Sequence, residues 1–312
     1  MSTLFTFPGQ GAQRAGMLHD LPQEGMVRDC IAEANDTLHI DVLTLDSEAD
    51  LKSTVSAQLC LLVAGVAMAR HLGAEAGAPD AVAGLSIGAY AAAVTASVLA
   101  YGDALRLVHR RARLMESAYP TGYGMTAILG LEQAVLAPLI AQVHSAASPV
   151  YLANINAPTQ LVLAGADAAL QRVAALAQAA GAHAAKPIAI GVPSHCELLA
   201  EAAAALSIEA SRVAVSAPRL RYYSASLGRE LRDGARIVGD LANNMAVPVR
   251  WHETNVLTGE HGARLAVEMP PGNVLTKLSA IAALADGVAV AAADTRVDTI
   301  VELMARESRR EA

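Results

Sequence analysis

The sequence predicts an α/β protein made of a large α/β unit with a parallel sheet and a smaller sheet unit inserted into it. Two observations carry this prediction. Residues 81–97 show a short apolar strand, a Gly-Leu-Ser-Ile-Gly turn and an alanine-rich helix, which is the context that exposes a nucleophilic serine. Residues 125–190 follow the order β-α-β-β-α-β, which is that of a ferredoxin-like unit.

Composition sets the broad class of the protein. The chain has 312 residues, of which 54% are hydrophobic and 17% charged, so it can bury a sizeable core. Its formal net charge of -7 argues against nucleic acid or an anionic membrane as a partner. We predict a cytoplasmic protein, because the start lacks a signal peptide and no apolar stretch reaches the ~20 residues of a membrane span. The three cysteines show no paired spacing, and no metal-binding motif is present.

The turn at Gly84-Leu85-Ser86-Ile87-Gly88 is the first candidate site. We expect a Cβ at either glycine to clash in so tight a turn, and Ser86 to have a strained backbone. The helix that follows directs its N-terminal N–H groups toward the serine hydroxyl. The alternative is an ordinary Gly/Ser turn.

The N-terminal part of the large unit begins with a buried strand at 4–7. The loop 8–11 resembles the start of a dinucleotide-binding fingerprint, but Arg14 stands where the third glycine should be. A loop that donates backbone N–H groups to a ligand is the better interpretation. Apolar spacing predicts helices at 26–38 and 53–71.

A helix beginning at Tyr101, with Asp103 as its cap, carries the second candidate. Arg111 falls on the same face as Ala104, Leu107 and other apolar residues. A guanidinium among core positions needs an anion. That anion is either a buried carboxylate of the protein or the carboxylate of a substrate, which a guanidinium can bind through two parallel hydrogen bonds.

The inserted unit is expected to cover 124–191, and the large catalytic unit 1–123 and 192–312. Its predicted elements are strands at 125–130, 150–155, 160–164 and 183–190 and helices at 132–144 and 167–180. The cleft between the two units is the natural ligand site.

The chain re-enters the large unit at His195, the third candidate. Ser194 and Glu197 form a plausible capping box, which would put His195 at the first position of a helix. The positive helix end would keep the imidazole neutral. Nothing in the sequence alone pairs His195 with Ser86. The remaining predicted elements are strands at 222–225 and 264–268 and helices at 235–245, after 273 and at 294–308, with Trp251 in the core.

Seven segments in a common order resemble the malonyl-CoA:acyl-carrier-protein transacylase family. They are Pro-Gly-Gln-Gly-Ala-Gln (8–13), Gly-Leu-Ser-Ile-Gly (84–88), Arg-Ala-Arg-Leu-Met (111–115), Asn-Ala-Pro-Thr-Gln (156–160), Val-Pro-Ser-His-Cys (192–196), Val-Pro-Val-Arg-Trp (247–251) and Pro-Gly-Asn-Val-Leu (271–275). The resemblance covers nearly the whole chain. It implies an α/β-hydrolase-like large domain with a ferredoxin-like insertion.

The resemblance also implies roles for individual residues. Ser86 would be the acyl nucleophile, with His195 as its general base. The main-chain N–H groups of Gln10 and Ile87 would form the oxyanion hole. Arg111 would bind the free carboxylate of the malonyl group. The last roles carried over are the main-chain carbonyl of Asn244, which would orient the histidine, and substrate binding by Gly9, Gln10 and Asn156.

Three positions depart from the family pattern. Leu85 replaces a histidine, Ala89 a glutamate, and Asn244 a glutamine. The form Gly-Leu-Ser-Ile-Gly-Ala is more similar to the transacylase (epsilon) subunit of malonate decarboxylase. The resemblance then implies malonyl-CoA as substrate, no bound cofactor, an acyl-carrier subunit with a CoA-like thiol as acceptor, and other decarboxylase subunits as partners.

Three alternatives remain open at the level of sequence. The chain could be a transacylase of fatty-acid or polyketide synthesis. It could be a serine thioesterase or other hydrolase that uses the same turn, although no acidic partner for His195 is evident. It could also be a docking subunit without catalytic activity.

Overall fold

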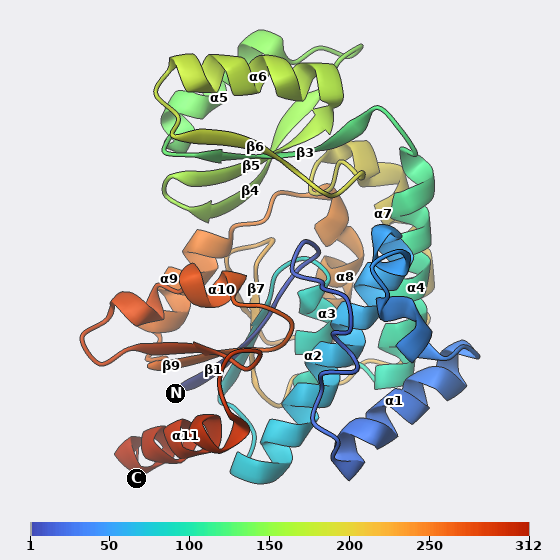
Figure 1. Ribbon diagram of the computed structural model, residues 1–312, viewed down its shortest axis with the longest axis vertical. Helices are drawn as coiled ribbons and strands as arrows, with labels where there is room; N and C mark the ends of the chain where they lie inside the picture. Colours follow the sequence, from blue (N-terminus) through green and yellow to red (C-terminus); the bar gives the residue numbers. More distant parts are fainter. Residues whose placement is uncertain (1, 312) are drawn as a thin grey trace.

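The computed structural model describes residues 2–311 and contains two separate sheets (Figure 1). The larger sheet has the strand order β10-β9-β1-β2-β7-β8, and the smaller has β4-β5-β3-β6. The strands are β1 (Thr3–Phe7), β2 (Ala81–Gly84), β3 (Tyr123–Leu129), β4 (Val150–Ala157), β5 (Gln160–Ala166), β6 (Ala184–Ile188), β7 (Arg221–Ser224), β8 (Arg229–Leu231), β9 (Leu265–Glu268) and β10 (Val288–Ala291).

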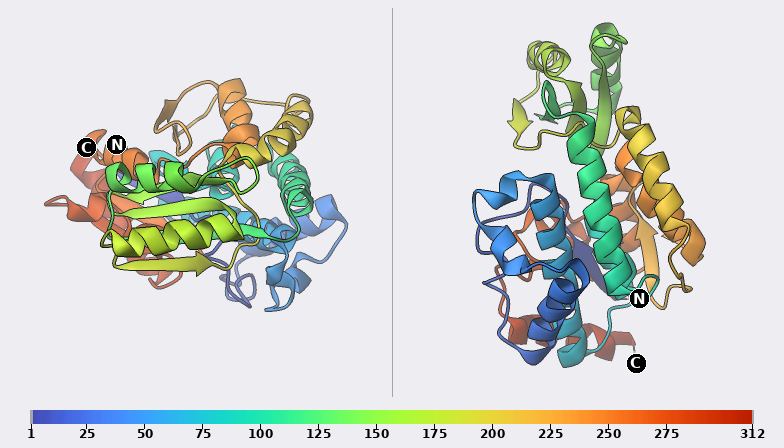
Figure 2. Two further views of the ribbon diagram at one scale, coloured as in Figure 1. Left: turned by 90° about the horizontal axis from the view of Figure 1, so that it is seen from above. Right: turned by 90° about the vertical axis from the view of Figure 1, so that its right-hand side faces the viewer.

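Helices connect these strands and cover the two sheets (Figure 2). The α-helices are α1 (Gly25–Leu38), α2 (Thr54–Ala76), α3 (Gly88–Thr95), α4 (Tyr101–Ala118), α5 (Gln133–Val143), α6 (Asp167–Ala179), α7 (Ala200–Ala210), α8 (Gly234–Asn243), α9 (Trp251–Glu260), α10 (Val274–Lys277) and α11 (Val297–Glu311). Short 3₁₀ helices are η1 (Val42–Asp46), η2 (Asp50–Lys52), η3 (Glu197–Leu199), η4 (Asn244–Ala246) and η5 (Ile281–Ala283).

The larger sheet brings two loops of the site together. Its central strands β1 and β2 are parallel and in register, with Phe7 opposite Gly84. Both strands are short, mostly apolar and fully buried, as expected for strands covered on both faces. Because parallel strands end at the same edge, the loop after Phe7 and the turn after Gly84 leave the sheet side by side.

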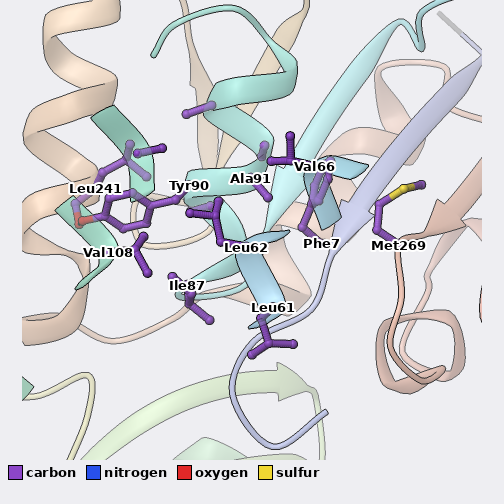
Figure 3. Packing of buried hydrophobic residues seen from close by; sticks show 14 of the residues in the cluster. Phe7, Leu61, Leu62, Val66, Ile87, Tyr90, Ala91, Val108, Leu241 and Met269 are labelled. Atoms are coloured by element: carbon purple, nitrogen blue, oxygen red, sulfur yellow. The ribbon is translucent and has the colours of Figure 1, made fainter. Parts of the chain in front are cut away.

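The core of the large unit forms around α2, which packs beside β1 and α3. Leu62 and Val66 of α2 lie close to Phe7 and Ala91 in Figure 3. By length and composition α2 could cross a membrane, with a mean hydropathy of 1.5, so the expectation that no apolar stretch is long enough is wrong for this helix. However, 89% of the apolar window is buried inside the protein, as in a core helix.

The smaller sheet has the strand order and antiparallel pairing of a ferredoxin-like unit, as predicted. Helices α5 and α6 cover one face, and the other face is directed toward the large unit (Figure 1). The strand β4 makes two main-chain hydrogen bonds to Val249 across this boundary. The Ile155 N–H donates to the Val249 carbonyl, and the Val249 N–H donates to the Ala153 carbonyl. The inserted unit is therefore tied to the body beside the site.

Candidate active site

The segment around Ser86 is a sharp strand-to-helix turn, as predicted. The strand β2 ends at Gly84, α3 begins at Gly88, and Ser86 lies between them with a φ angle of 57°. This left-handed conformation is strained for a residue with a side chain. A Cβ added at Gly84 would lie 2.2 Å from the main-chain nitrogen of Ala89. One added at Gly88 would lie 2.1 Å from the carbonyl oxygen of Phe7. The turn therefore requires both glycines.

We expect Gly88→Ala to destabilise the protein by about 3 kcal/mol or more, because the added methyl group would displace the main chain after β1. The Tm measured by circular dichroism should fall by roughly 6–12 °C. Gly239→Ala is the matched control, since a Cβ at Gly239 in α8 meets nothing within 4 Å. The control should be neutral or slightly stabilising. An unchanged Tm for Gly88→Ala would contradict this account of the turn.

The structure brings Ser86 and His195 together across 109 residues of sequence. The distance from His195 Nε2 to Ser86 Oγ is 2.9 Å. On the other side of the ring, His195 Nδ1–H donates to the main-chain carbonyl of Asn244 at 2.8 Å. Because a carbonyl can only accept, the proton is on Nδ1, and Nε2 is free to accept the hydroxyl proton of Ser86.

The backbone around His195 differs from the prediction. His195 has a φ angle of 66° and precedes η3, so it does not occupy the first position of a helix. The expected capping box is absent, since the Ser194 hydroxyl donates to the carbonyl of Val192 at 3.4 Å. The main-chain N–H of His195 instead donates to the carbonyl of Met245 at 2.7 Å. The segment Asn244–Met245 therefore binds both the strained backbone of His195, through Met245, and its imidazole ring, through Asn244.

His195 is neutral, although for a reason other than the predicted helix end. Burial, followed by the positive charge of Arg111, lowers its pKa to about 4. His195 is 3% exposed, which leaves little water to stabilise an imidazolium. Near neutral pH, His195 is therefore a proton acceptor in contact with a hydroxyl.

The lowered pKa of His195 predicts an unusual pH profile. The base form predominates above about pH 4, so the rate at which a neutral sulfonyl fluoride modifies Ser86 should stay constant between about pH 5.5 and 8. A histidine with the ordinary pKa of about 6.5 would lose half of that rate at pH 6.5. A midpoint near 6.5 in this measurement would contradict the assignment.

Arg111 is fully buried and lies against the same hydroxyl. Its Nη2 donates to Ser86 Oγ at 3.2 Å and to Asn244 Oδ1 at 3.0 Å, and its Nη1 donates to Gln58 Oε1 at 2.7 Å. Burial lowers the pKa of this guanidinium below its ordinary value. Among residues 2–311, Arg111 has no carboxylate partner, and its Nε has no hydrogen-bond acceptor. The alternative of a structural ion pair is therefore not realised.

A cavity of about 210 Å³ opens beside these groups. It lies between the two units, since Met125, Val162 and Ile188 of the smaller sheet line it together with the loop after β1. Five predicted residues are in its wall, namely Gly9, Gln10, Ser86, Asn156 and His195. Arg111 has no exposed surface, and its Nη2 contacts the cavity wall directly at Ser86 Oγ.

The main-chain N–H groups of Gln10 and Ile87 were the predicted oxyanion donors. Neither donates a hydrogen bond to any group in the described part of the chain. Gln10 lies in the cavity wall, while the Ile87 side chain packs in the core (Figure 3). Both donors thus remain available to an acceptor.

Sequence reasoning missed Gln58, Met115 and Asn154. Gln58 connects Arg111 to Gln10, because its Nε2 donates to Gln10 Oε1 at 3.3 Å and to Met115 Sδ at 3.4 Å. The sequence signal for Gln58 is that it is the only side-chain amide in the apolar helix α2. A buried amide normally has a hydrogen-bond partner, so such a residue indicates a polar contact inside the core. Asn154 Oδ1 lacks a partner among the described residues, although the side chain lines the cavity.

Comparison with known proteins places this geometry in a family. A family model for the acyl transferase domain matches residues 4–311. The malonyl CoA-acyl carrier protein transacylase of Haemophilus influenzae is 36% identical over 280 residues, covering 88% of this chain and 89% of that protein.

Solved structures agree with the sequence comparison. The malonyl CoA-acyl carrier protein transacylase of Coxiella burnetii has a TM-score of 0.91 at 31% identity, with 98% of each chain covered. A malonyl-transacylase in complex with a type II PKS acyl-carrier protein has a TM-score of 0.91 at 34% identity, covering 97% of this chain and 100% of that one. This chain belongs to the acyl transferase family and, within it, to the malonyl-CoA:acyl-carrier-protein transacylases.

Proposed function

We propose that the protein transfers a malonyl group from malonyl-CoA, through a malonyl-Ser86 intermediate, to the thiol on the prosthetic group of an acyl carrier protein. The observation that carries this proposal is the position of Arg111. A fully buried guanidinium without a carboxylate partner in the described chain lies 3.2 Å from the Ser86 hydroxyl. Such a cation is stabilised when an anion joins it, and the free carboxylate of a malonyl group is that anion.

The reaction proceeds in two halves. His195 removes the proton of Ser86 as Oγ attacks the thioester carbonyl, and the main-chain N–H groups of Gln10 and Ile87 bind the oxyanion. The tetrahedral intermediate expels the CoA thiolate, which takes the proton from His195. In the second half the carrier thiol gives its proton to His195 and attacks the malonyl ester. The tetrahedral intermediate expels Ser86 Oγ, which takes the proton back from His195, so the serine hydroxyl and the neutral imidazole are restored. These steps require no resident metal or redox cofactor.

Acylation changes what Ser86 offers to Arg111. In the free enzyme, Oγ is a hydroxyl oxygen that accepts from Nη2 at 3.2 Å. In the acyl-enzyme, Oγ is an ester oxygen, which is a much poorer acceptor. The malonyl carboxylate then takes over the Nη2 N–H that Ser86 accepted from, and the unused Nε donor of the guanidinium.

The relatives favour one pathway over the other. They carry the names of acyl-carrier-protein transacylases, and one was solved with a polyketide acyl-carrier protein. A transacylase of fatty-acid or polyketide synthesis is thus better supported than the malonate decarboxylase subunit predicted from the Leu85 and Ala89 departures. The names of the relatives described above mention no decarboxylase subunit, so further decarboxylase subunits as partners stay a prediction. We retain the domain boundaries 1–123 with 192–312 and 124–191, and the cytoplasmic location, as predictions.

Mass spectrometry of the intact protein tests the proposal. After incubation with malonyl-CoA, the mass should rise by one malonyl group. A phosphopantetheinylated carrier protein should then remove the group and appear as malonyl-carrier. Release of free malonate in place of malonyl-carrier would identify a hydrolase, and an unmodified chain would indicate a docking subunit.

A further inference from the structure

We propose that the side-chain amide of Asn244 is a positioning residue that holds Arg111 in place relative to Ser86. This inference rests on the proposed function and deepens it, since it concerns how the carboxylate-binding guanidinium is fixed. Asn244 contacts all three central groups. Its main-chain carbonyl accepts from His195 Nδ1, its Oδ1 accepts from Arg111 Nη2, and its Nδ2 donates to the main-chain carbonyl of Ser86 at 3.2 Å.

The orientation of this amide is determined from both sides. A guanidinium can only donate, so the atom facing Arg111 must be the oxygen Oδ1. A main-chain carbonyl can only accept, so the atom facing Ser86 must be the nitrogen Nδ2. The two requirements agree, and a flipped amide would lose both bonds. The amide therefore links Arg111 directly to the backbone of the turn that carries the nucleophile.

The backbone of Asn244 is held independently of its side chain. Asn244 is the C-cap residue of α8, and its main-chain N–H donates to the carbonyl of Asp240 in that helix. The carbonyl of the adjacent Met245 accepts from the His195 N–H at 2.7 Å. Asn244 itself is 4% exposed. A substitution of the side chain should thus keep the main-chain carbonyl that orients His195, so the amide can be tested separately.

The need for this contact follows from the burial of Arg111. Only three oxygens accept from its guanidinium among the described residues, on Gln58, Asn244 and Ser86. Acylation of Ser86 weakens one of them, so Gln58 and Asn244 remain to hold the cation while it binds malonyl. Without the amide, Nη2 would keep no protein acceptor in the acyl-enzyme and the guanidinium could turn away from the ester.

Two substitutions separate positioning from simple packing. Asn244→Ala removes both side-chain bonds, so kcat/KM for malonyl-CoA should fall about 10- to 100-fold, the usual effect of losing a hydrogen bond to a charged group. The rate at which a neutral sulfonyl fluoride modifies Ser86 should change by less than about threefold, since the Ser86–His195 contact is retained. The malonyl defect should lie mainly in KM, because the ground-state carboxylate contact is the one weakened.

The near-isosteric variant Asn244→Asp gives the decisive comparison. It fills the same space, but its carboxylate would pair with Arg111 permanently and compete with the malonyl carboxylate. We expect malonyl transfer by Asn244→Asp to be about tenfold lower than by Asn244→Ala. The ratio of malonyl to acetyl transfer should fall by the same factor. This ratio does not depend on how much of each variant is folded.

Asn243 supplies the matched control at the neighbouring position. It is exposed, and its Nδ2 donates to the carbonyl of Gly239, away from the site. Asn243→Ala and Asn243→Asp should leave the malonyl-to-acetyl ratio as in the wild-type chain. The inference is overturned if Asn244→Asp retains more malonyl transfer than Asn244→Ala, or if both substrates lose equally. Wild-type protein that takes no malonyl group would instead overturn the proposed function itself.

Discussion

Replacing Ser86 by alanine should abolish labelling of the chain by malonyl-CoA and lower malonyl transfer by about 10⁴-fold or more. The reason is that no other hydroxyl accepts from Arg111 or lies within hydrogen-bond distance of His195 Nε2 in residues 2–311. The fold should survive, because the substitution removes one oxygen and leaves the glycines of the turn intact. Radiolabelled malonyl-CoA, followed by acid precipitation of the protein, measures the bound label.

Ser97 provides a control with the same backbone strain. It is an exposed serine with a φ angle of 61°, close to the 57° of Ser86. Ser97→Ala therefore makes the same substitution at a residue with a left-handed backbone conformation outside the site. Labelling of this variant by malonyl-CoA should stay stoichiometric. Persistent label in Ser86→Ala, at the level of the Ser97 control, would remove Ser86 from the mechanism.

Local features of the fold could be predicted because they depend on neighbours in sequence. The turn at 84–88 needs glycines wherever it occurs, and its strand and helix are encoded within a few residues on either side. The order of strands and helices in the inserted unit could likewise be predicted, because the spacing of apolar residues alternates between that of a strand and that of a helix. The strands and α-helices that were not predicted are two short strands and the ten-residue helix α9, and one predicted helix cap is wrong. The strands β8 and β10 have three and four residues. The N-cap position of α4 is Ala100, which forms no side-chain cap, and Asp103 lies in the first turn of the helix instead of at its cap.

Long-range pairing could not be predicted in the same way. His195 was correctly singled out, but its partner Ser86 is 109 residues away and its ring is oriented by a third segment. The neutral state was predicted from a helix end that does not exist at His195. Burial and the charge of Arg111 lower its pKa instead, and both depend on tertiary packing. Gln58, which completes the network, belongs to no sequence motif, and its only local signal is that it is a lone amide in the apolar helix α2.

Arg111→Met should change the substrate preference of the enzyme more than any other substitution. Methionine fills much of the buried space without a charge, so the malonyl carboxylate would enter an apolar site with no partner. Truncated buried charge pairs cost about 2–5 kcal/mol, which corresponds to about 30- to several thousand-fold in kcat/KM for malonyl-CoA. Acetyl-CoA has no such carboxylate, so its transfer should stay unchanged or rise. Steady-state kinetics with both donors measure the ratio.

The control for the loss of charge lies on the same helix. Arg113 is exposed on α4, so Arg113→Met removes one positive charge two residues away without emptying the buried site. Its malonyl-to-acetyl ratio should match that of the wild-type chain. In Arg111→Met the pKa of His195 should also rise, because the charge of Arg111 is the second cause that lowers it. The acid limb of the sulfonyl fluoride profile should then move to higher pH. Equal losses on both donors, with no movement of this limb, would make Arg111 a structural residue and leave the malonyl preference without a physical basis.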